Sequence, residues 1–268
     1  DLNAGVRVED NEFFGNFTTW QLGASAPVGD ALRLRGSVGR GIKEPTFFEL
    51  FATGFATGNP GLDPEQSLSW EFGADYQAAG VSLGATWFDQ SIEDLIQFTS
   101  APPNPSDPSF FNVAEAAIRG LEFEAGVSLG SVDLGGSWTW LDTEVIDAGF
   151  QSGPGATFVN GEQLIRRPEH TVRLNAAAQP TSALGVSAAI ERVGDRADLD
   201  FSSFPADRVS LDAYTLLDAA LTWSPMGMGG VSVVGRVENL LDQAYQGAAG
   251  FFAPGRAFTV EVRAGFGG

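Results

Sequence analysis

The stretch Leu68-Ser-Trp-Glu-Phe-Gly-Ala-Asp-Tyr76 alternates apolar and polar side chains with a period of two residues. Trp70 and Phe72 stand among its apolar positions, and Glu71 and Asp75 stand among its polar ones. Successive side chains of a β-strand point to opposite faces of the sheet. The stretch therefore predicts a strand with one apolar face and one polar face.

The same alternation recurs along the chain, in about twelve segments. Many of them approach the roughly 9–11 residues that a tilted strand needs to cross a bilayer. No stretch keeps a helical period over a dozen residues, so the sequence predicts an all-β chain. The clearest further segments are Val81–Trp87, Leu121–Leu129, Val132–Trp140, Val172–Ala178, Leu184–Ile190, Val231–Val237 and Phe258–Phe266.

Short and long connections alternate between these segments. In an up-and-down meander every second connection emerges at the same end of the sheet, and bacterial outer-membrane barrels have short turns at one end and long loops at the other. The short turns are Pro27–Asp30, Ala78–Gly80, Gly130, Pro180–Ser182 and Pro225–Gly230. The longer connections, which we expect at one end, are Asp10–Asn16, Gly41–Pro64, Asp94–Phe110, Ile146–Ile165, Asp195–Asp212 and Leu240–Pro254.

Two all-β architectures compete for this pattern, a soluble β-sandwich and a transmembrane β-barrel. The polar face carries charges of both signs in mid-strand, which suits a wet lumen, and the six tryptophans fall mostly near strand ends on the apolar face. These features favour an antiparallel up-and-down transmembrane barrel. The expected lumen residues include Glu71, Glu122, Arg236 and Glu261. The expected lipid-facing residues include Trp70, Phe72, Leu121, Phe123, Val132, Leu134, Val260 and Val262, with Leu134 near the middle of the bilayer.

The composition narrows the chemistry. The net charge of −19 argues against nucleic-acid binding, which needs a cationic surface. The chain has no cysteine and one histidine, so His170 cannot build a multi-histidine metal site and more simply starts a strand. The acidic segment Asp195–Asp212 lacks EF-hand spacing and is interpreted as a solvated loop, with Ca²⁺ binding left open. We find no active site and expect no enzyme and no cofactor.

Two blocks of residues follow one another along the chain. The first block comprises Gly39, Gly41, Lys43, Pro45, Thr46, Glu49, Leu50, Asn59, Pro60, Leu62, Pro64, Glu65, Ser67, Glu71 and Gly73. The second block is Val237-Glu-Asn-Leu-Leu-Asp242 with Tyr245 and Pro254–Arg256. These two blocks closely resemble signatures of TonB-dependent outer-membrane receptors, most nearly those for cobalamin and siderophores, and Arg166-Arg-Pro-Glu-His-Thr171 is a third, weaker match.

The resemblance implies a barrel of about 22 strands whose lumen holds an N-terminal plug. Residues 1–268 then correspond to its C-terminal portion of about twelve strands, without the plug and the TonB box, and unable to couple transport to energy alone. We expect an open curved sheet with edges at Leu2–Val8 and Phe258–Phe266. A small barrel closed between these edges is the alternative. Glu122 and Glu124 share one face and are expected to pair with arginines of the plug.

By the same resemblance, the function is TonB-dependent active uptake of a scarce bulky nutrient, such as siderophore-bound iron or cobalamin, across the bacterial outer membrane. The implied partners are this ligand, the TonB complex, outer-membrane lipid and lipopolysaccharide. Phe47, Phe48, Phe51 and Phe55 lie in a long loop and either line a substrate vestibule or pack against neighbouring loops. A passive porin-like or structural barrel is the alternative function, and an esterase or protease on a barrel is disfavoured by the missing catalytic residues.

Overall fold

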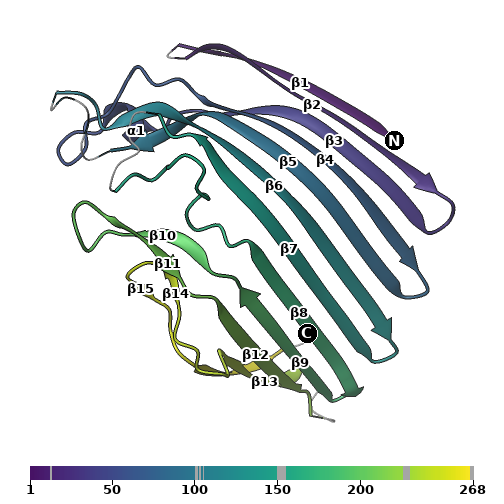
Figure 1. Cartoon of the computed structure of the whole chain (residues 1–268). Helices are drawn as coiled ribbons and strands as arrows, with labels where there is room; N and C mark the ends of the chain where they lie inside the picture. Colours follow the sequence, from purple (N-terminus) through teal and green to yellow (C-terminus); the bar gives the residue numbers. More distant parts are fainter. Residues whose placement is uncertain are drawn as a thin grey trace.

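Twelve antiparallel strands form one continuous sheet (Figure 1). The structure, a computed structural model, describes residues 1–12, 14–99, 102, 104, 106–149, 155–225 and 230–265, without the side chains of 113 and 114. The order of the strands across the sheet is the same as their order along the chain, from β1 to β16. The strands are β1 (Leu2–Asn11), β2 (Gly15–Val28), β3 (Leu32–Lys43), β4 (Glu65–Ala78), β5 (Val81–Phe98), β6 (Phe110–Leu129), β7 (Val132–Asp147), β8 (His170–Thr181), β9 (Leu184–Val193), β12 (Tyr214–Trp223), β13 (Val231–Glu238) and β16 (Ala257–Ala264).

This order confirms the predicted all-β meander. The remaining elements belong to the long connections: α1 (Phe47–Phe51), the hairpin of β10 (Arg196–Asp200) with β11 (Asp207–Leu211), and the hairpin of β14 (Gln246–Ala248) with β15 (Phe251–Phe252). No helix among the described residues is long and apolar enough to cross a membrane. The predicted end of the last strand, Phe266, lies outside the described residues.

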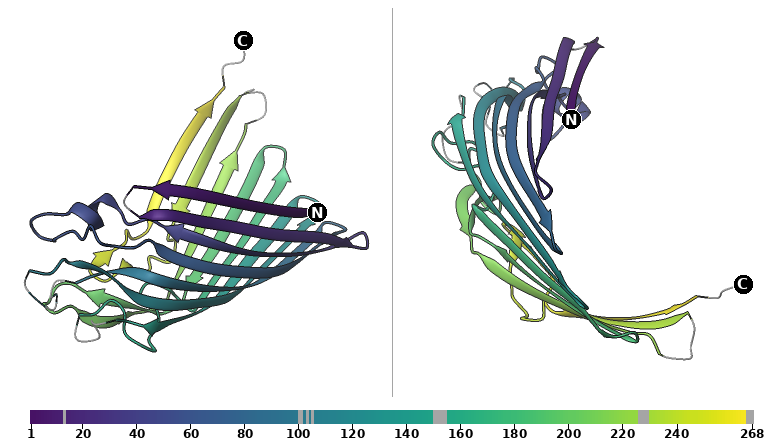
Figure 2. Two further views of the ribbon diagram at one scale, coloured as in Figure 1. Left: turned by 90° about the horizontal axis from the view of Figure 1, so that it is seen from above. Right: turned by 90° about the vertical axis from the view of Figure 1, so that its right-hand side faces the viewer.

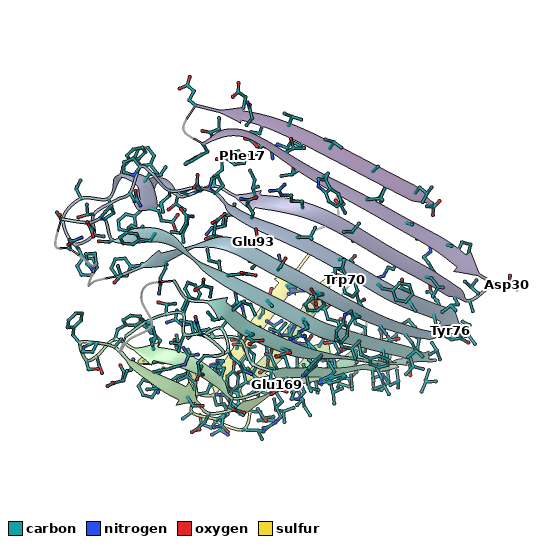
Figure 3. All side chains as sticks on the ribbon, turned by 45° about the horizontal axis from the view of Figure 1, so that its top comes forward. Phe17, Asp30, Trp70, Tyr76, Glu93 and Glu169 are labelled. Carbon is teal, nitrogen blue, oxygen red and sulfur yellow. The ribbon has the colours of Figure 1, made fainter. Side chains whose placement is uncertain are left out.

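The predicted segregation of connections is confirmed for the loops after β3, β5, β7, β9 and β13. Because consecutive strands are antiparallel neighbours, these five loops all emerge at one end, called the loop end here (Figure 1). Figure 3 shows Asp30 and Tyr76 at the opposite, short-turn end. The connection at Asp10–Asn16 emerges at the loop end too, but it is shorter than predicted, because the ladder of β1 and β2 continues to the pair Asn11 and Gly15.

The strand register assigns each side chain to a face. Directly paired residues share a face, so the row Phe72, Trp87, Leu121, Trp140 and His170 lies on one side of the sheet. All six tryptophans lie on this apolar face by the same rule. The polar face carries the expected lumen residues, among them Glu71, Glu122, Arg236 and Glu261. The predicted separation of the two faces is confirmed.

The polar face is the concave one. The sheet curves strongly (Figure 2), and the shallow hollows of its surface lie along polar-face residues such as Arg35, Glu124 and Arg236. Arg35 crosses two strands here, with its Nε 3.2 Å from the Asp75 carboxylate and its Nη2 donating to Thr86 Oγ1 at 2.5 Å. Gly73 makes room for the guanidinium, because a Cβ at that position would lie 2.8 Å from Arg35 Cζ.

The two edges of the sheet stay apart. β1 pairs only with β2 and β16 pairs only with β13 along the described residues, which agrees with the predicted open sheet. Figure 2 shows these outer strands diverging at opposite margins of the curve. A closed barrel of these twelve strands alone is therefore not the observed arrangement.

The apolar face forms a band between the two ends of the sheet. Leu134 is only the third residue of β7, so it stands nearer the short-turn end than the middle of that strand, and its depth near mid-bilayer stays a prediction. The apolar face of β7 continues through Gly136 to Trp138 and Trp140. Leu174 pairs with Gly136 and covers it, since a Cβ on this glycine would lie 2.7 Å from Leu174 Cδ2. On β8 the apolar-face positions run from His170 to Ala178, and Leu174 is the middle one.

We expect Leu174→Arg to lower the free energy of unfolding in bilayers by roughly 2–4 kcal/mol, because a cation at the midplane loses its hydration. Asn175→Arg is the matched control on the polar face of the same strand and should cost much less. Urea unfolding of the full-length protein in lipid vesicles measures both. Equal costs for the two variants would contradict the assignment of faces.

Candidate functional site: the loop end of the sheet

The long loop after β3 folds around the short helix α1. Thr46 caps the helix: its Oγ1 accepts a hydrogen bond from Glu49 N at 3.3 Å, and Glu49 Oε2 accepts one from Thr46 N at 2.6 Å. This reciprocal capping box satisfies two amides that a helix of five residues would otherwise leave unpaired. The signal for it, Thr followed three residues later by Glu, stands in the sequence, although helical periodicity does not reveal so short a helix.

The α1 loop is anchored to the hairpin of β5 and β6. Thr57 N donates to Ser109 Oγ at 3.0 Å, and Ser109 N donates to Thr57 O at 2.8 Å. Asn59 Nδ2 donates to the carbonyl of Phe110 at 2.8 Å. Asn112 accepts from Asp63 N and returns a bond to Asp63 O. Backbone groups of the two loops thereby satisfy each other, and the loops form one unit.

A small apolar core lies beneath α1. Leu50, Ala56, Leu62 and Phe110 are buried together there. At its edge the mostly buried Glu65 carboxylate lies 2.9 Å from Lys43 Nζ and also accepts from Ile96 N at 3.1 Å. We call this α1 loop together with the tip of the β5–β6 hairpin (residues 43–65, 94–99 and 106–112) the first loop cluster.

The structure places the four predicted ligand-contact phenylalanines on the surface of this cluster. Phe47 is 80% exposed and Phe55 is 92% exposed, whereas Phe51 is 39% exposed. Phe48 packs edge-on against Phe110 at a centroid distance of 5.7 Å, and Phe55 stacks on Phe98 at 6.1 Å. Contact with neighbouring loops therefore occurs for two of them, and ligand contact stays a prediction.

A second cluster joins the other long loops around the buried carboxylate of Asp198. Arg166 Nε donates to Asp198 Oδ1 at 2.8 Å from the loop after β7, and Ala249 N donates to Oδ2 at 2.8 Å from the loop after β13. Arg196 Nη2 reaches the carbonyls of Gln246 and Gly247. Residues 145–149, 155–166, 195–212 and 240–256 form this second loop cluster, visible below the first one in Figure 1.

The Asp198 carboxyl remains ionised in spite of its burial. Burial alone would raise its pKa, but the hydrogen bonds from Ala249 N and Leu199 N outweigh burial, and Arg166 adds to them. The pKa of Asp198 therefore lies below its usual value. The prediction that this acidic segment is solvated was wrong for Asp198, which is fully buried. Sequence reasoning missed it because its partners lie 32 and 51 residues away.

No cluster of three acidic, histidine or cysteine side chains suited to a metal ion occurs among the residues that the structure describes. His170 begins β8, as predicted. Its Nδ1 accepts from Trp138 Nε1 at 3.4 Å on the apolar face.

The concave wall below the loops carries unpaired carboxylates. Glu122 and Glu124 are exposed on β6 and form no hydrogen bond or ion pair with any described residue. By contrast, neighbouring polar-face cations are paired: Arg35 with Glu71 and Asp75, and Arg173 with Glu191 at 2.7 Å. The carboxylates of Glu122 and Glu124 are therefore available to cationic side chains from outside this sheet.

The sheet is antiparallel, has long loops at one end, and has one apolar face and one polar, concave face. These features are typical of an outer-membrane β-barrel protein. The family model "TonB dependent receptor-like, beta-barrel" matches residues 1–240. The chain belongs to the TonB-dependent receptor family, and this membership places it in the bacterial outer membrane.

Curated relatives are transporters. The vitamin B12 transporter BtuB of Photobacterium profundum is 32% identical, over 91% of this chain and 37% of that protein. BtuB of Vibrio cholerae is 28% identical, over 97% of this chain and 39% of that protein. The chain thus spans about two fifths of the length of these relatives.

Solved structures share the fold. The ferric enterobactin receptor PfeA aligns with a TM-score of 0.77 at 21% identity, over 98% of this chain and 43% of that one. The siderophore receptor PirA of Acinetobacter baumannii aligns with a TM-score of 0.77 at 19% identity, over 99% of this chain and 43% of that one.

We expect Asp198→Asn to loosen the second loop cluster, because three donors lose a charged acceptor. A cost of roughly 2 kcal/mol would speed exchange of the Leu199 and Ala249 amides roughly 30-fold in hydrogen-exchange measurements. Because the pKa of Asp198 is lowered, its charge stabilises the folded loops at neutral pH. This stabilisation is lost as the pH falls through the lowered pKa, which lies below the usual value of ~4. Asp195→Asn, which is exposed, is the control. Unchanged exchange in Asp198→Asn would refute the role of this carboxylate.

Proposed function

We propose that the chain is the C-terminal portion of the barrel of a TonB-dependent receptor that actively takes up a scarce, bulky nutrient. The open sheet carries this proposal, because β1 and β16 present unpaired backbone groups that lipid cannot satisfy. Strands outside this chain would pair with both edges and complete a wider barrel, whose N-terminal plug and TonB box also lie outside residues 1–268. Coverage of about two fifths of each transporter relative supports this arrangement.

The nutrient would enter at the loop end. The first loop cluster presents Phe47 and Phe55 to solvent on a platform that is ordered by its own hydrogen bonds. A rigid aromatic surface binds a bulky ligand at low entropic cost. The relatives' names support a cobalamin-like or siderophore-like ligand, and the inner-membrane TonB complex would supply the energy. No enzymatic activity is part of the proposal, since the relatives are transporters and receptors.

The lumen would hold a plug with cationic side chains opposite β6. Glu122 and Glu124 stand unpaired on the concave wall, and a desolvated carboxylate needs a cationic or hydrogen-bonding partner. A passive barrel of about twelve strands, the alternative considered from the sequence, is disfavoured by the separated edges.

Binding of cyanocobalamin and ferric enterobactin to cells that express the full-length receptor tests the ligand side. Phe47→Ala with Phe55→Ala should weaken binding of the accepted ligand by about tenfold, the scale of a lost aromatic anchor. Phe251→Ala, which is 75% exposed in the second loop cluster, is the control and should bind normally. Binding of neither ligand by the parent receptor would contradict the proposed class, whereas unchanged binding by the double variant would contradict only the site.

The plug contact is tested by replacing both carboxylates, Glu122→Gln with Glu124→Gln, in the full-length receptor. We expect the plug to unfold at a lower urea concentration in this variant than in the parent. The free energy of unfolding should fall by roughly 2–5 kcal/mol, because cations of the plug lose their carboxylate partners. Asp30→Asn, in a short turn, is the matched control. Identical urea midpoints for parent and variant would show that no cation of the plug depends on these two residues.

A further inference from the structure

The concave face of the sheet changes its chemistry along strands β5, β6 and β7. Toward the short turns it carries the charged side chains described above, and toward the loop end it carries Phe88, Ile118 and Leu141. Phe88 pairs directly with Glu71 and with Gly120, and Leu141 pairs with Gly120 from β7, so these side chains share the concave face. Ile118 precedes Gly120 by one period of two residues and lies on the same face. We call Phe88, Ile118 and Leu141 the wall patch.

The ring of Phe88 lies across Gly120. A Cβ atom at this glycine would lie 2.8 Å from Cε1 of the ring and closer still to Cζ, so a larger residue would push the ring away from the wall. The three side chains of the patch are half-buried and keep part of their surface exposed. One row beyond Ile118, the paired Ala116 and Val145 are fully buried, so the accessible apolar wall ends there. The wall patch is therefore a small platform with an aromatic ring at its centre.

Exposed apolar side chains are unexpected on this face. It is the polar side of the sheet, and the apolar residues of the same strands otherwise face outward, as Trp87, Leu121 and Trp140 do. Three apolar side chains on three neighbouring strands form a contiguous patch, and such a patch marks a place where a partner covers the surface. Water leaves apolar surface when a partner with an apolar face binds there.

The charges around the wall patch are negative. Glu71 lies beside Phe88 in the same row, and Glu122 follows Gly120 by one period toward the short turns. The two cross-strand rows through the patch hold no cation among the described residues. Arg35, on the near side of Glu71, is occupied by that carboxylate at 3.8 Å and by a second one at 3.2 Å. A ligand with net negative charge would be repelled here.

The wall patch lies between the loop end and the part of the wall that we assign to the plug. β5 leads from Phe88 to Phe98, whose ring stacks on Phe55 in the first loop cluster. In the other direction β6 leads from Ile118 to the unpaired carboxylate of Glu122. A nutrient that moves from the first loop cluster into the lumen along these strands therefore meets the patch before it reaches the level of the plug contact.

We propose that Phe88, Ile118 and Leu141 form a second binding surface for the nutrient, which selects a bulky ligand with an apolar face and no net negative charge. The Phe88 ring covers the apolar face of the ligand, and Gly120 lets the ring stay against the wall. This inference rests on the proposed function, because the nutrient must enter at the loop end. It adds a determinant of specificity that lies on the sheet itself and not in the loops.

Equilibrium binding of cyanocobalamin, which has no net charge, and of ferric enterobactin, which is an anion, to the full-length receptor in detergent micelles tests the proposal. The parent should bind cyanocobalamin more tightly, and tighter binding of ferric enterobactin would overturn the proposed selectivity. The Phe88→Ala, Leu141→Ala double variant should bind cyanocobalamin about tenfold more weakly, the scale of a lost aromatic anchor. Leu216→Ala is the matched control, because Leu216 is a half-buried apolar residue of the concave face on β12, and it should bind as the parent does.

Urea unfolding of the plug, followed in the same samples, distinguishes the nutrient from the plug as the occupant of the patch. The midpoint of the double variant should equal that of the parent. A lower midpoint with unchanged nutrient binding would assign the patch to the plug and overturn the proposal. Phe88→Tyr keeps the ring and should bind cyanocobalamin as the parent does. Binding of neither ligand by the parent would count against the proposed function itself, whereas parent-like binding by the double variant would count against the wall patch alone.

Discussion

Backbone hydrogen bonding inside a hydrocarbon layer is the constraint on which this structure depends. A strand in lipid has no water to satisfy its N–H and C=O groups, so each must pair with a neighbouring strand. The ladders from β1 to β16 meet this demand at every interior strand. Once the ladders fix the register, the side-chain period of two separates the faces, and Trp87 and Trp140 face lipid while Glu122 faces the lumen.

The loops follow a different rule, because water and short polar side chains can satisfy their backbone groups. The first cluster is ordered by the capping box at Thr46 and by bonds between Thr57 and Ser109, whereas the second depends on the single buried carboxylate of Asp198. The loop end thus combines two units that are stabilised by different kinds of interaction.

The sequence predicts the strands, their faces and the loop end well, because period-two alternation and turn residues are local signals. It misses α1 because five residues show no period. The sequence predicts that Asp198 is solvated, because its contacts with Arg166 and Ala249 form only when the loops fold together. Ligand contact by Phe47, Phe48, Phe51 and Phe55 stays a prediction, because the exposure of a side chain does not identify a ligand.

The separation of a lipid face from a wet lumen face is the central claim, and a nitroxide scan along β6 tests it most directly. The chain has no cysteine, so single cysteines at residues 121 to 127 of the full-length receptor can be labelled one at a time. Labels at Leu121, Phe123 and Ala125 should be accessible to oxygen from the lipid, and labels at Glu122 and Glu124 should be shielded from it. Accessibility without a period of two, or with the two sets reversed, would contradict the account.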